Sequence, residues 1–525
     1  METSALKNDL SIKDSYAGKT ILIAGASGYL GKVFLALVLE KLPDVKKIYI
    51  LLRKRRLRSS RDRFEQMINR SFVFHNLHER YGAKLTDYIS KRVEMLEGDV
   101  VLPNLGLSSA SILELRENLD LFVNSAGLVD FNPDLREAVA INIKGTLACA
   151  EFVKSCKKAR FLHVSTCFVS GQKNGRFEER VTLNLNPIGK PFDAEAEYVE
   201  ITKLVEAHTD ANDSLESKRQ IREEMVKKGM IRAKELGWTN TYTYTKGISE
   251  HLLKLRYPDL PVSILRPSIV ESSISFPFPG WNEGFNTCGP LAHLLSTWFR
   301  YLPAKKGNPF DVIPVDQVAK AMALGGMELL CGTHKEVYQA ASSDLNPLSI
   351  DQAAELTSLS HQQYFRRQGR GFWQRWVRPW WRVKSIGNSF HPMGAKQMKL
   401  YCHLLSKLCR QLKMHALELK FARYEKKWGQ ILNVLELFRP FIHDYRQVYV
   451  TQNLTQIHIK EKDMRFDPKS WDWKIYWQDI HMPGLRRWCF PVIRRETVES
   501  LNPIHPFYWP TPAKVQTEIS DVKSS

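Results

Sequence analysis

Residues 19–31, which read KTILIAGASGYLG, decide the fold of this chain. An apolar run at 21–24 ends at Gly25, and apolar residues at helical spacing follow it. This order predicts a buried parallel strand, a tight turn and a helix whose first N–H groups face a pyrophosphate. Gly25 allows the tight turn, Gly28 the close approach of a phosphate, and Gly31 the packing of the helix on the strand.

A second apolar run, at 47–52, lies where the second strand of a βαβ unit is needed. A glycine triplet alone is a weak signal, because ordinary turns are also rich in glycine. With both strands and the helix in place, the sequence predicts a dinucleotide-binding unit. The residues assigned to the cofactor in this loop are Gly25, Ser27, Gly28, Tyr29, Leu30 and Gly31.

A basic cluster, RKRRLR at 53–58, follows the second strand. A carboxylate at this point would bind the ribose of NAD, whereas cations receive the 2′-phosphate of NADP. Arg53 is the leading candidate and indicates NADPH, with Arg55 and Arg56 as weaker ones. The alternative is a solvated basic loop.

Further apolar runs predict strands at 92–96, 121–124, 160–165 and 262–265. The carboxyl ends of parallel strands meet at the ligand crevice of a doubly wound sheet, so the residues just beyond these runs are binding candidates. They are Asp99, Val100, Ser125, Ala126, Pro267 and Ser268. Asp99 is equally a common turn residue.

Tyr242 and Lys246 are four residues apart, so on a helix they project from one face. A phenol with a pKa near ~10 is a poor proton donor unless a cation stabilises its phenolate. Lys246 would supply that charge and bind the nicotinamide ribose, while Thr166 would hold a substrate carbonyl oxygen. Ser165 competes with Thr166, and Tyr244 competes with Tyr242 from another helix face.

These motifs, in this order, resemble extended short-chain dehydrogenases and, within them, the fatty acyl-CoA reductase family. The resemblance rests on GASGYLGKV, VSTCFV, TYTYTK and ILRPSIVES, on PGW at 279–281 and on DVIPVD at 311–316. The resemblance continues in DW at 472–473, His481 and GL at 484–485. Within the family, the chain is similar to the soluble bacterial members. Many members have tyrosine at the position of Phe168, and the membrane-bound members carry C-terminal hydrophobic segments not found in this sequence.

The resemblance implies NADPH-dependent reduction of a long-chain acyl-CoA to a fatty alcohol through an aldehyde. Tyr242 would donate the proton, Lys246 would tune its pKa and Thr166 would bind the oxyanion. It also implies that Asp99 contacts the adenine and that Asn142 is a structural asparagine of the cofactor site, although a buried asparagine is often only a satisfied core group. The alternatives are a reductase that gives or consumes aldehyde, and a non-catalytic NADP-binding scaffold at a membrane.

The 525 residues are 43% hydrophobic and 25% charged, as in globular proteins, and carry a net charge of +20. We expect a cytoplasmic protein, because no apolar run reaches the roughly 18 residues of a membrane span and the N-terminus is polar. Scattered cysteines argue against disulfides or a metal site. The expected architecture is α/β: a Rossmann-type doubly wound parallel sheet at 15–360, a mainly helical domain at 361–510 and a disordered tail at 511–525.

The positive charge predicts an anionic partner. Residues 364–384 combine seven cations with four tryptophans, a composition that suits membrane interfaces, phosphate-rich CoA or an acidic acyl-carrier protein. We rank membrane or carrier contact first and expect no nucleic acid, because no nucleic-acid-binding module is present. The sequence does not indicate an oligomeric state.

Overall fold

A seven-stranded, entirely parallel sheet forms the centre of the computed structural model, which describes residues 10–54, 58–208, 214–283, 288–297, 299–368, 383–385 and 391–510. Its strand order is β11-β7-β5-β4-β1-β2-β3. The strands are β1 (Thr20–Ala24), β2 (Lys47–Leu52), β3 (Val93–Glu97), β4 (Leu121–Asn124), β5 (Arg160–Val164), β7 (Val262–Pro267) and β11 (Val337–Ala340). The order reverses between β1 and β4, which places a ligand crevice at their carboxyl ends. The predicted Rossmann-type fold is confirmed.

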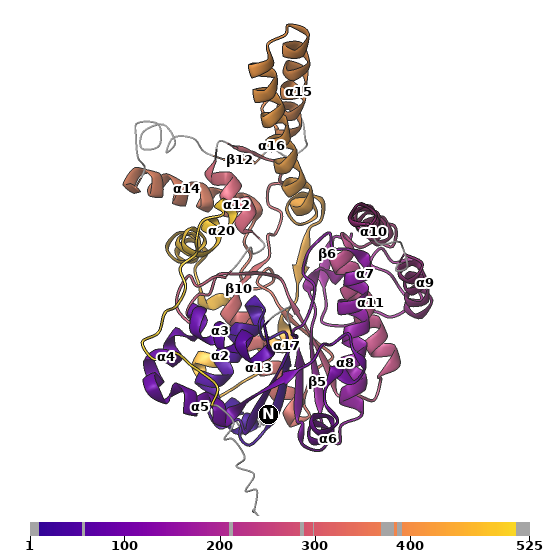
Figure 1. Cartoon of the computed structure of the whole chain (residues 1–525), viewed down its shortest axis with the longest axis vertical. Helices are drawn as coiled ribbons and strands as arrows, with labels where there is room; N and C mark the ends of the chain where they lie inside the picture. Colours follow the sequence, from indigo (N-terminus) through magenta and orange to yellow (C-terminus); the bar gives the residue numbers. More distant parts are fainter. Residues whose placement is uncertain are drawn as a thin grey trace, which may run out of the picture.

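Alternate residues of β1 serve two helical layers, because successive side chains of a strand point to opposite faces. Ile21 and Ile23 pack in the core formed with α2 (Tyr29–Lys41) and α13 (Val315–Cys331). Leu22 and Ala24 pack on the other face, with α8 (Gly145–Lys154). Figure 1 shows α2 and α8 on opposite sides of the sheet. Every residue of β1 is therefore buried.

The predicted strands agree with the observed ones to within two residues, except that β11 was not predicted. The run 311–316 forms β10 (Val312–Pro314), which pairs with β8 (Ile269–Glu271) outside the main sheet. The segment between β2 and β3 contains α3 (Ser60–Arg70), α4 (His75–Tyr81) and α5 (Leu85–Arg92).

An insertion between β5 and β7 packs against α11 (Thr241–Arg256). It contains β6 (Gly175–Phe177), α9 (Ala194–Glu206) and α10 (Leu215–Glu235), and residues 216–228 of α10 form a charged run. α10 leads to α11, the helix that carries Tyr242 and Lys246. Asn240 caps α11 by accepting a hydrogen bond from the Thr243 N–H.

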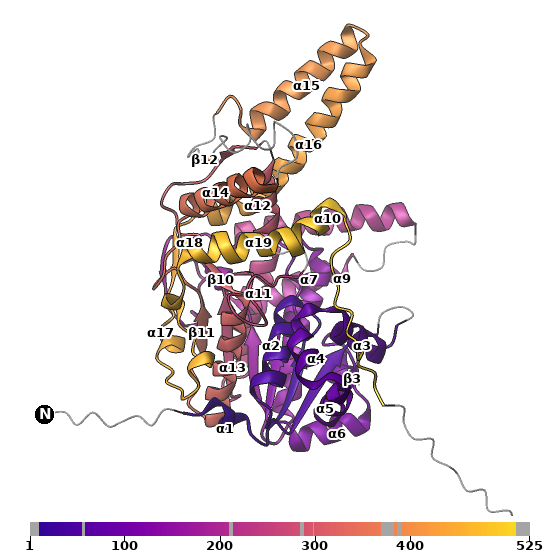
Figure 2. The ribbon, with the colours of Figure 1, turned by 90° about the vertical axis from the view of Figure 1, so that its left-hand side faces the viewer.

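The C-terminal part is mainly helical and packs back on the sheet domain. Its helices are α14 (Ile350–Gln368), α15 (Ala395–Gln411), α16 (His415–Arg439), α17 (Gln452–Thr455), α18 (Trp473–Ile475), α19 (Met482–Gly484) and α20 (Phe490–Arg494). Its strand β13 (Gln447–Tyr449) pairs with β6. Figures 1 and 2 show α15 and α16 as a hairpin that projects from the rest of the molecule.

Two predicted features lie outside the described residues: the tail 511–525, and residues 369–382 of the tryptophan-rich segment. Arg55 and Arg56 also lie outside them. Within the described part of the chain, no helix is both long enough and apolar enough to cross a bilayer. All eight cysteines are free thiols.

Candidate active site

The glycine loop lies in the crevice between β1 and β4. Gly25 has a φ of +84°, and a Cβ there would lie 2.5 Å from the Ala126 nitrogen. A Cβ on Gly31 would overlap the Gly25 carbonyl oxygen, while Gly28 is the N-cap of α2. Only backbone fits in this cradle, so the N–H groups at the start of α2 remain available to an anion. The predicted geometry of the loop is observed.

Two residues of the loop are held by neighbouring parts of the chain. The Tyr29 hydroxyl donates to the Glu271 carbonyl oxygen over 3.0 Å, and its ring stacks on Trp281 at a centroid distance of 5.1 Å. Leu30 packs against the main core. Tyr29 therefore fixes the start of α2 by packing.

Arg53 and Asp99 lie together at the ends of β2 and β3. The Arg53 Nη1 is 3.6 Å from the Asp99 Oδ2, and Arg53 is half-exposed. Asp99 also accepts a hydrogen bond from the Val101 N–H, the turn contact expected as its alternative role. Val100 is buried against Gly145 at the start of α8, where it packs rather than faces solvent.

The structure adds Arg63 to this group. Its guanidinium donates to the Arg53 carbonyl oxygen, and with Ser27 and Lys32 it lines a cleft of about 470 Å³. A capping box at Ser59, which starts α3, directs this helix back over the end of β2. No spacing rule could have identified Arg63, because the placement depends on how α3 packs.

Ser125 and Ala126 line the other side of the crevice, where Gly25 approaches them. Asn142 lies in a π-helical stretch, Val139–Lys144, and is fully buried. It accepts from the Leu128 N–H at 2.9 Å and donates to the Leu128 carbonyl at 3.1 Å. Asn142 therefore holds the loop after β4 in place, which is the structural role expected of it.

Lys246 reaches this loop from α11. Its Nζ donates to the Val164 carbonyl oxygen at 2.8 Å, and a Cβ on Gly127 would lie 3.3 Å from it. Burial lowers the pKa of Lys246 to about 8, although the charge of Glu250 opposes this shift. The ammonium group therefore lies at the crevice, beside the loop that follows β4.

Tyr242 and Thr166 meet at the carboxyl end of β5. The phenol of Tyr242 hydrogen-bonds the Thr166 side chain, which lowers its pKa, but the larger effect of burial raises it. Thr166 Oγ1 also accepts from the Phe168 N–H and lies 3.4 Å from the Pro267 carbonyl oxygen. Thr166 is therefore the side chain that contacts the Tyr242 phenol, and Lys246 lies one helical turn further along α11.

The competing residues are placed elsewhere. Tyr244 is buried among the insertion helices, and its hydroxyl bonds Glu197. The Ser165 hydroxyl is buried and makes no hydrogen bond within the described residues.

The Cys167 thiol donates to the Arg266 carbonyl oxygen at 3.0 Å, and burial raises its pKa. Ser268 is buried beside Asp311, behind the end of β7.

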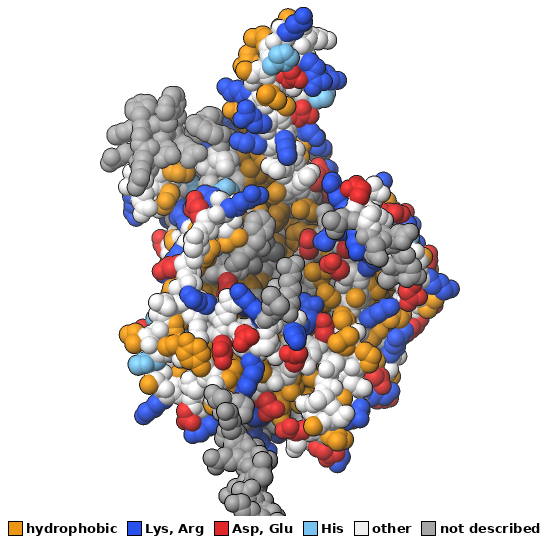
Figure 3. All heavy atoms as spheres, viewed as in Figure 1, with side chains coloured by type: hydrophobic (Ala, Val, Ile, Leu, Met, Phe, Trp, Pro, Cys, Tyr) orange, Lys and Arg blue, Asp and Glu red, His pale blue; other side chains and the backbone are white. Residues whose placement is uncertain are grey.

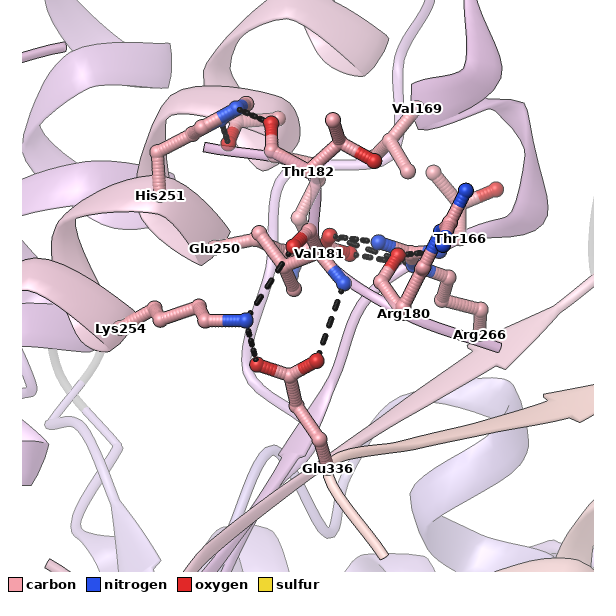
Figure 4. Close-up of polar contacts among 12 residues, drawn as sticks. Thr166, Val169, Arg180, Val181, Thr182, Glu250, His251, Lys254, Arg266 and Glu336 are labelled. Carbon is pink, nitrogen blue, oxygen red and sulfur yellow. Dashed lines mark hydrogen bonds and ion pairs between the residues drawn. The ribbon is translucent and has the colours of Figure 1, made fainter. Parts of the chain in front are cut away.

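A buried ion pair braces the helix that carries Tyr242. Arg266 Nε donates to Glu250 Oε1 at 3.0 Å, and Arg266 Nη1 donates to the Arg180 carbonyl oxygen at 3.2 Å (Figure 4). Near the C-terminal end of α11, Lys254 pairs with Glu336. Glu250 is one helical turn beyond Lys246, a spacing visible in the sequence, but its partner Arg266 could be found only from the structure.

An aromatic cluster lies directly beside Thr166. Phe168 contacts Phe441 edge to face at 4.7 Å between centroids, and Phe131 contacts Phe441 at 5.6 Å and Phe438 at 6.3 Å. Phe131 and Phe168 are partly exposed. These residues come from the loops after β4 and β5 and from the end of α16. The polar pair therefore borders an apolar surface.

A second buried polar cluster lies next to Tyr29. It joins His481 of the C-terminal part to Glu271 and Cys288. Cys288 donates its N–H to Glu271 Oε1 at 2.8 Å, and its Sγ lies 3.4 Å from His481 Nε2. Burial lowers the pKa of His481 to about 3, so the imidazole is neutral. This set has the residue types of a metal site, but its polar atoms already bond one another, and we assign it a structural role.

This chain is similar to curated proteins that are named fatty acyl-CoA reductases. The family model described as "Male sterility protein", an NAD-binding family, matches residues 23–322. A probable fatty acyl-CoA reductase 4 of Arabidopsis thaliana is 29% identical over 493 residues, covering 89% of this chain and 96% of its own. The alcohol-forming fatty acyl-CoA reductase of Simmondsia chinensis is 27% identical, covering 90% and 98%.

The fold also has a solved counterpart. The reductase domain of a non-ribosomal peptide synthetase from Mycobacterium tuberculosis superimposes with a TM-score of 0.51, covering 91% of this chain and 92% of its own. At 16% sequence identity, this likeness concerns the fold alone.

Proposed function

The chain belongs to the male sterility protein family, and from this membership we propose that it is an NADPH-dependent fatty acyl-CoA reductase that forms a fatty alcohol through an aldehyde. It is an oxidoreductase with a nicotinamide cofactor. The observation that supports the specific reaction is the Tyr242–Thr166 pair, hydrogen-bonded at the crevice and bordered by phenylalanines.

The backbone cradle at residues 25–31 fits a dinucleotide, because a side chain at Gly25 or Gly31 would fill it. NADPH, when bound, supplies a hydride. The N–H groups at the start of α2 would bind its pyrophosphate, and Lys246 would bind its nicotinamide-side ribose. Arg53, with Arg63 behind it, would bind the 2′-phosphate.

In the first reduction, the thioester carbonyl oxygen would lie between the Tyr242 phenol and the Thr166 hydroxyl. As negative charge develops on that oxygen, both hydroxyls donate to it. Burial raises the pKa of Tyr242, so the phenol is protonated at neutral pH, and transfer of its proton would need the nearby Lys246 cation to stabilise the phenolate. The resulting hemithioacetal expels the CoA thiolate as the aldehyde forms.

A second reduction of the aldehyde at the same pair would give the primary alcohol. The fatty chain would lie against Phe131, Phe168 and Phe441, because an acyl chain gains free energy by leaving water. Long-chain acyl-CoA is the proposed substrate, with an acyl-carrier protein as the second source of the thioester. We also propose that the 364–384 segment contacts the anionic group that delivers the substrate.

An assay with purified full-length protein, NADPH and palmitoyl-CoA tests this function. We expect NADPH oxidation together with release of a free CoA thiol. The absence of oxidation with any acyl thioester would contradict it and would favour a non-catalytic NADP-binding scaffold. Oxidation with free aldehydes alone would favour an aldehyde reductase.

Cofactor choice is a testable consequence of Arg53. Replacing Arg53 by Ala removes a charge-assisted bond to the 2′-phosphate, which is worth about 1.5–3 kcal/mol. We expect the ratio of kcat/KM for NADPH to that for NADH to fall by about 10- to 100-fold. The control is Arg58→Ala, which removes a cation bonded to Gln66. An unchanged ratio for Arg53→Ala would exclude it as the selector.

The pH dependence should follow Lys246. We expect kcat/KM to fall by about tenfold per pH unit above pH 8, because deprotonation removes the cation that binds the ribose. Unfolding would not explain this loss. The pKa of Lys246 is about 8 in the folded protein and 10.5 in the unfolded chain, so between these pH values the unfolded chain binds more protons. The contribution of Lys246 to the free energy of unfolding therefore rises with pH in this range. A pH-rate profile that stays flat to about pH 10 would contradict the assignment.

A further inference from the structure

The hairpin of α15 and α16 exposes a row of leucines. Leu400, Leu404 and Leu408 of α15 and its C-cap residue Leu412 follow one another every four residues, and their exposed fractions are 52, 53, 49 and 60%. Side chains at this spacing lie on one face of a helix. We call these four residues the leucine row. Figure 3 shows hydrophobic side chains on the projecting hairpin, interspersed with lysine and arginine.

The face that α15 buries is made of small residues instead. Cys402, Ser406 and Cys409 are each 7% exposed, and the Ser406 hydroxyl bonds the Glu418 carbonyl oxygen of α16. A helix at a protein surface ordinarily buries its leucines and exposes its polar residues. In α15 this arrangement is reversed, so the leucine row is not explained by the packing of the hairpin itself.

The hairpin is also strongly basic. Residues 394–429 contain nine Lys and Arg and two Glu. Arg410 pairs with Glu418. A net charge of +7 on this segment would repel a second copy of the same hairpin. Exposed leucines among cations fit the surface of a lipid bilayer, where anionic headgroups cover apolar acyl chains.

The base of the hairpin reaches the candidate active site. The end of α16 supplies Phe438, and Phe441 follows it; both contact Phe131, and Phe441 contacts Phe168. Phe168 is two residues from Thr166. One continuous element therefore connects the exposed leucine row with the apolar surface beside the polar pair.

We propose that the α15–α16 hairpin docks the protein on an anionic lipid surface. The leucine row enters the boundary between headgroups and acyl chains, and the surrounding lysines and arginines bind the lipid phosphates. Each such cation adds to the attraction by an anionic surface. This goes beyond the reduction itself, because lipid binding requires neither NADPH nor a competent Tyr242.

Vesicle co-sedimentation of the full chain tests the proposal. We expect binding to vesicles of phosphatidylcholine mixed with phosphatidylglycerol, weaker binding to phosphatidylcholine alone, and release at about 1 M salt, where screening acts within about 3 Å. The double variant Leu404→Glu, Leu408→Glu should lower the partition coefficient by about 100-fold, about tenfold for each leucine. Its melting temperature should match that of the wild type, because both leucines are exposed.

The matched control is Leu113→Glu. Leu113 is 65% exposed on α6 (Ser109–Asn118), at the opposite end of the molecule from the hairpin (Figure 1). This variant should bind vesicles as the wild type does. Equal binding by the double variant, or no vesicle binding by the wild type, would overturn the proposal.

The other occupants of the leucine row are distinguishable. A wild-type dimer that becomes a monomer in the double variant, with no vesicle binding by either, would show that a second copy covers the row. Binding of an acidic acyl-carrier protein through the same leucines, again without vesicle binding, would show a protein partner. Either result would overturn lipid docking while leaving the reductase proposal intact.

Discussion

Replacing Tyr242 by Phe is expected to lower kcat about 10³-fold with palmitoyl-CoA, while NADPH binding stays largely unchanged. The variant keeps the ring and its packing and removes only the hydroxyl that bonds Thr166. Single-turnover measurements of NADPH oxidation, with NADPH affinity from fluorescence titration, would separate the two effects.

Tyr244→Phe is the matched control for this change. It removes an equivalent hydroxyl two residues away, but that hydroxyl bonds Glu197 in the insertion rather than Thr166. We expect lower stability with kcat within about twofold of the wild type, since no reacting group is touched. Activity that survived in Tyr242→Phe and fell in Tyr244→Phe would reassign the proton donor.

Gly25→Ala should have the second large effect, on stability and cofactor binding together. A residue other than glycine at a φ of +84° costs about 1–3 kcal/mol, and the added Cβ would overlap the backbone at Ser125 and Ala126. We expect the free energy of unfolding to fall by about 3 kcal/mol or more, and the Kd for NADPH to rise at least about tenfold. Chemical denaturation and titration measure these quantities.

Gly18→Ala separates the two causes. Gly18 also has a positive φ, +70°, but a Cβ there would meet no atom within 4 Å. We therefore expect a loss of about 1 kcal/mol and normal NADPH binding. Equal effects of the two substitutions would mean that the approach of β1 to β4 is unimportant.

The parts of the site that could be predicted from sequence are local ones. The glycine loop has the predicted strand, turn and helix, because these follow one another within residues 20–41 and each glycine has a steric reason. Tyr242 and Lys246 share a helix face for the same reason: a spacing of four fixes it. Their roles in catalysis remain predictions.

The remaining parts depend on contacts between distant segments. Thr166 was preferred to Ser165 from the sequence, but its contact with Tyr242 depends on the placement of α11 against the end of β5. The hydrogen bond of the Lys246 Nζ to the Val164 carbonyl and the contact of Thr166 with the phenol likewise depend on how α11 packs against β5, and the role of Lys246 in tuning Tyr242 stays a prediction. Arg63 and Arg266 owe their positions to the packing of α3 and to the brace on α11.

The number of NADPH molecules oxidised per CoA thiol released, with the product identified, distinguishes an alcohol-forming reductase from one that stops at the aldehyde. We expect two NADPH per thiol and a fatty alcohol from palmitoyl-CoA. One NADPH per thiol with accumulated aldehyde would contradict formation of the alcohol, and thiol release without NADPH oxidation would contradict reduction altogether.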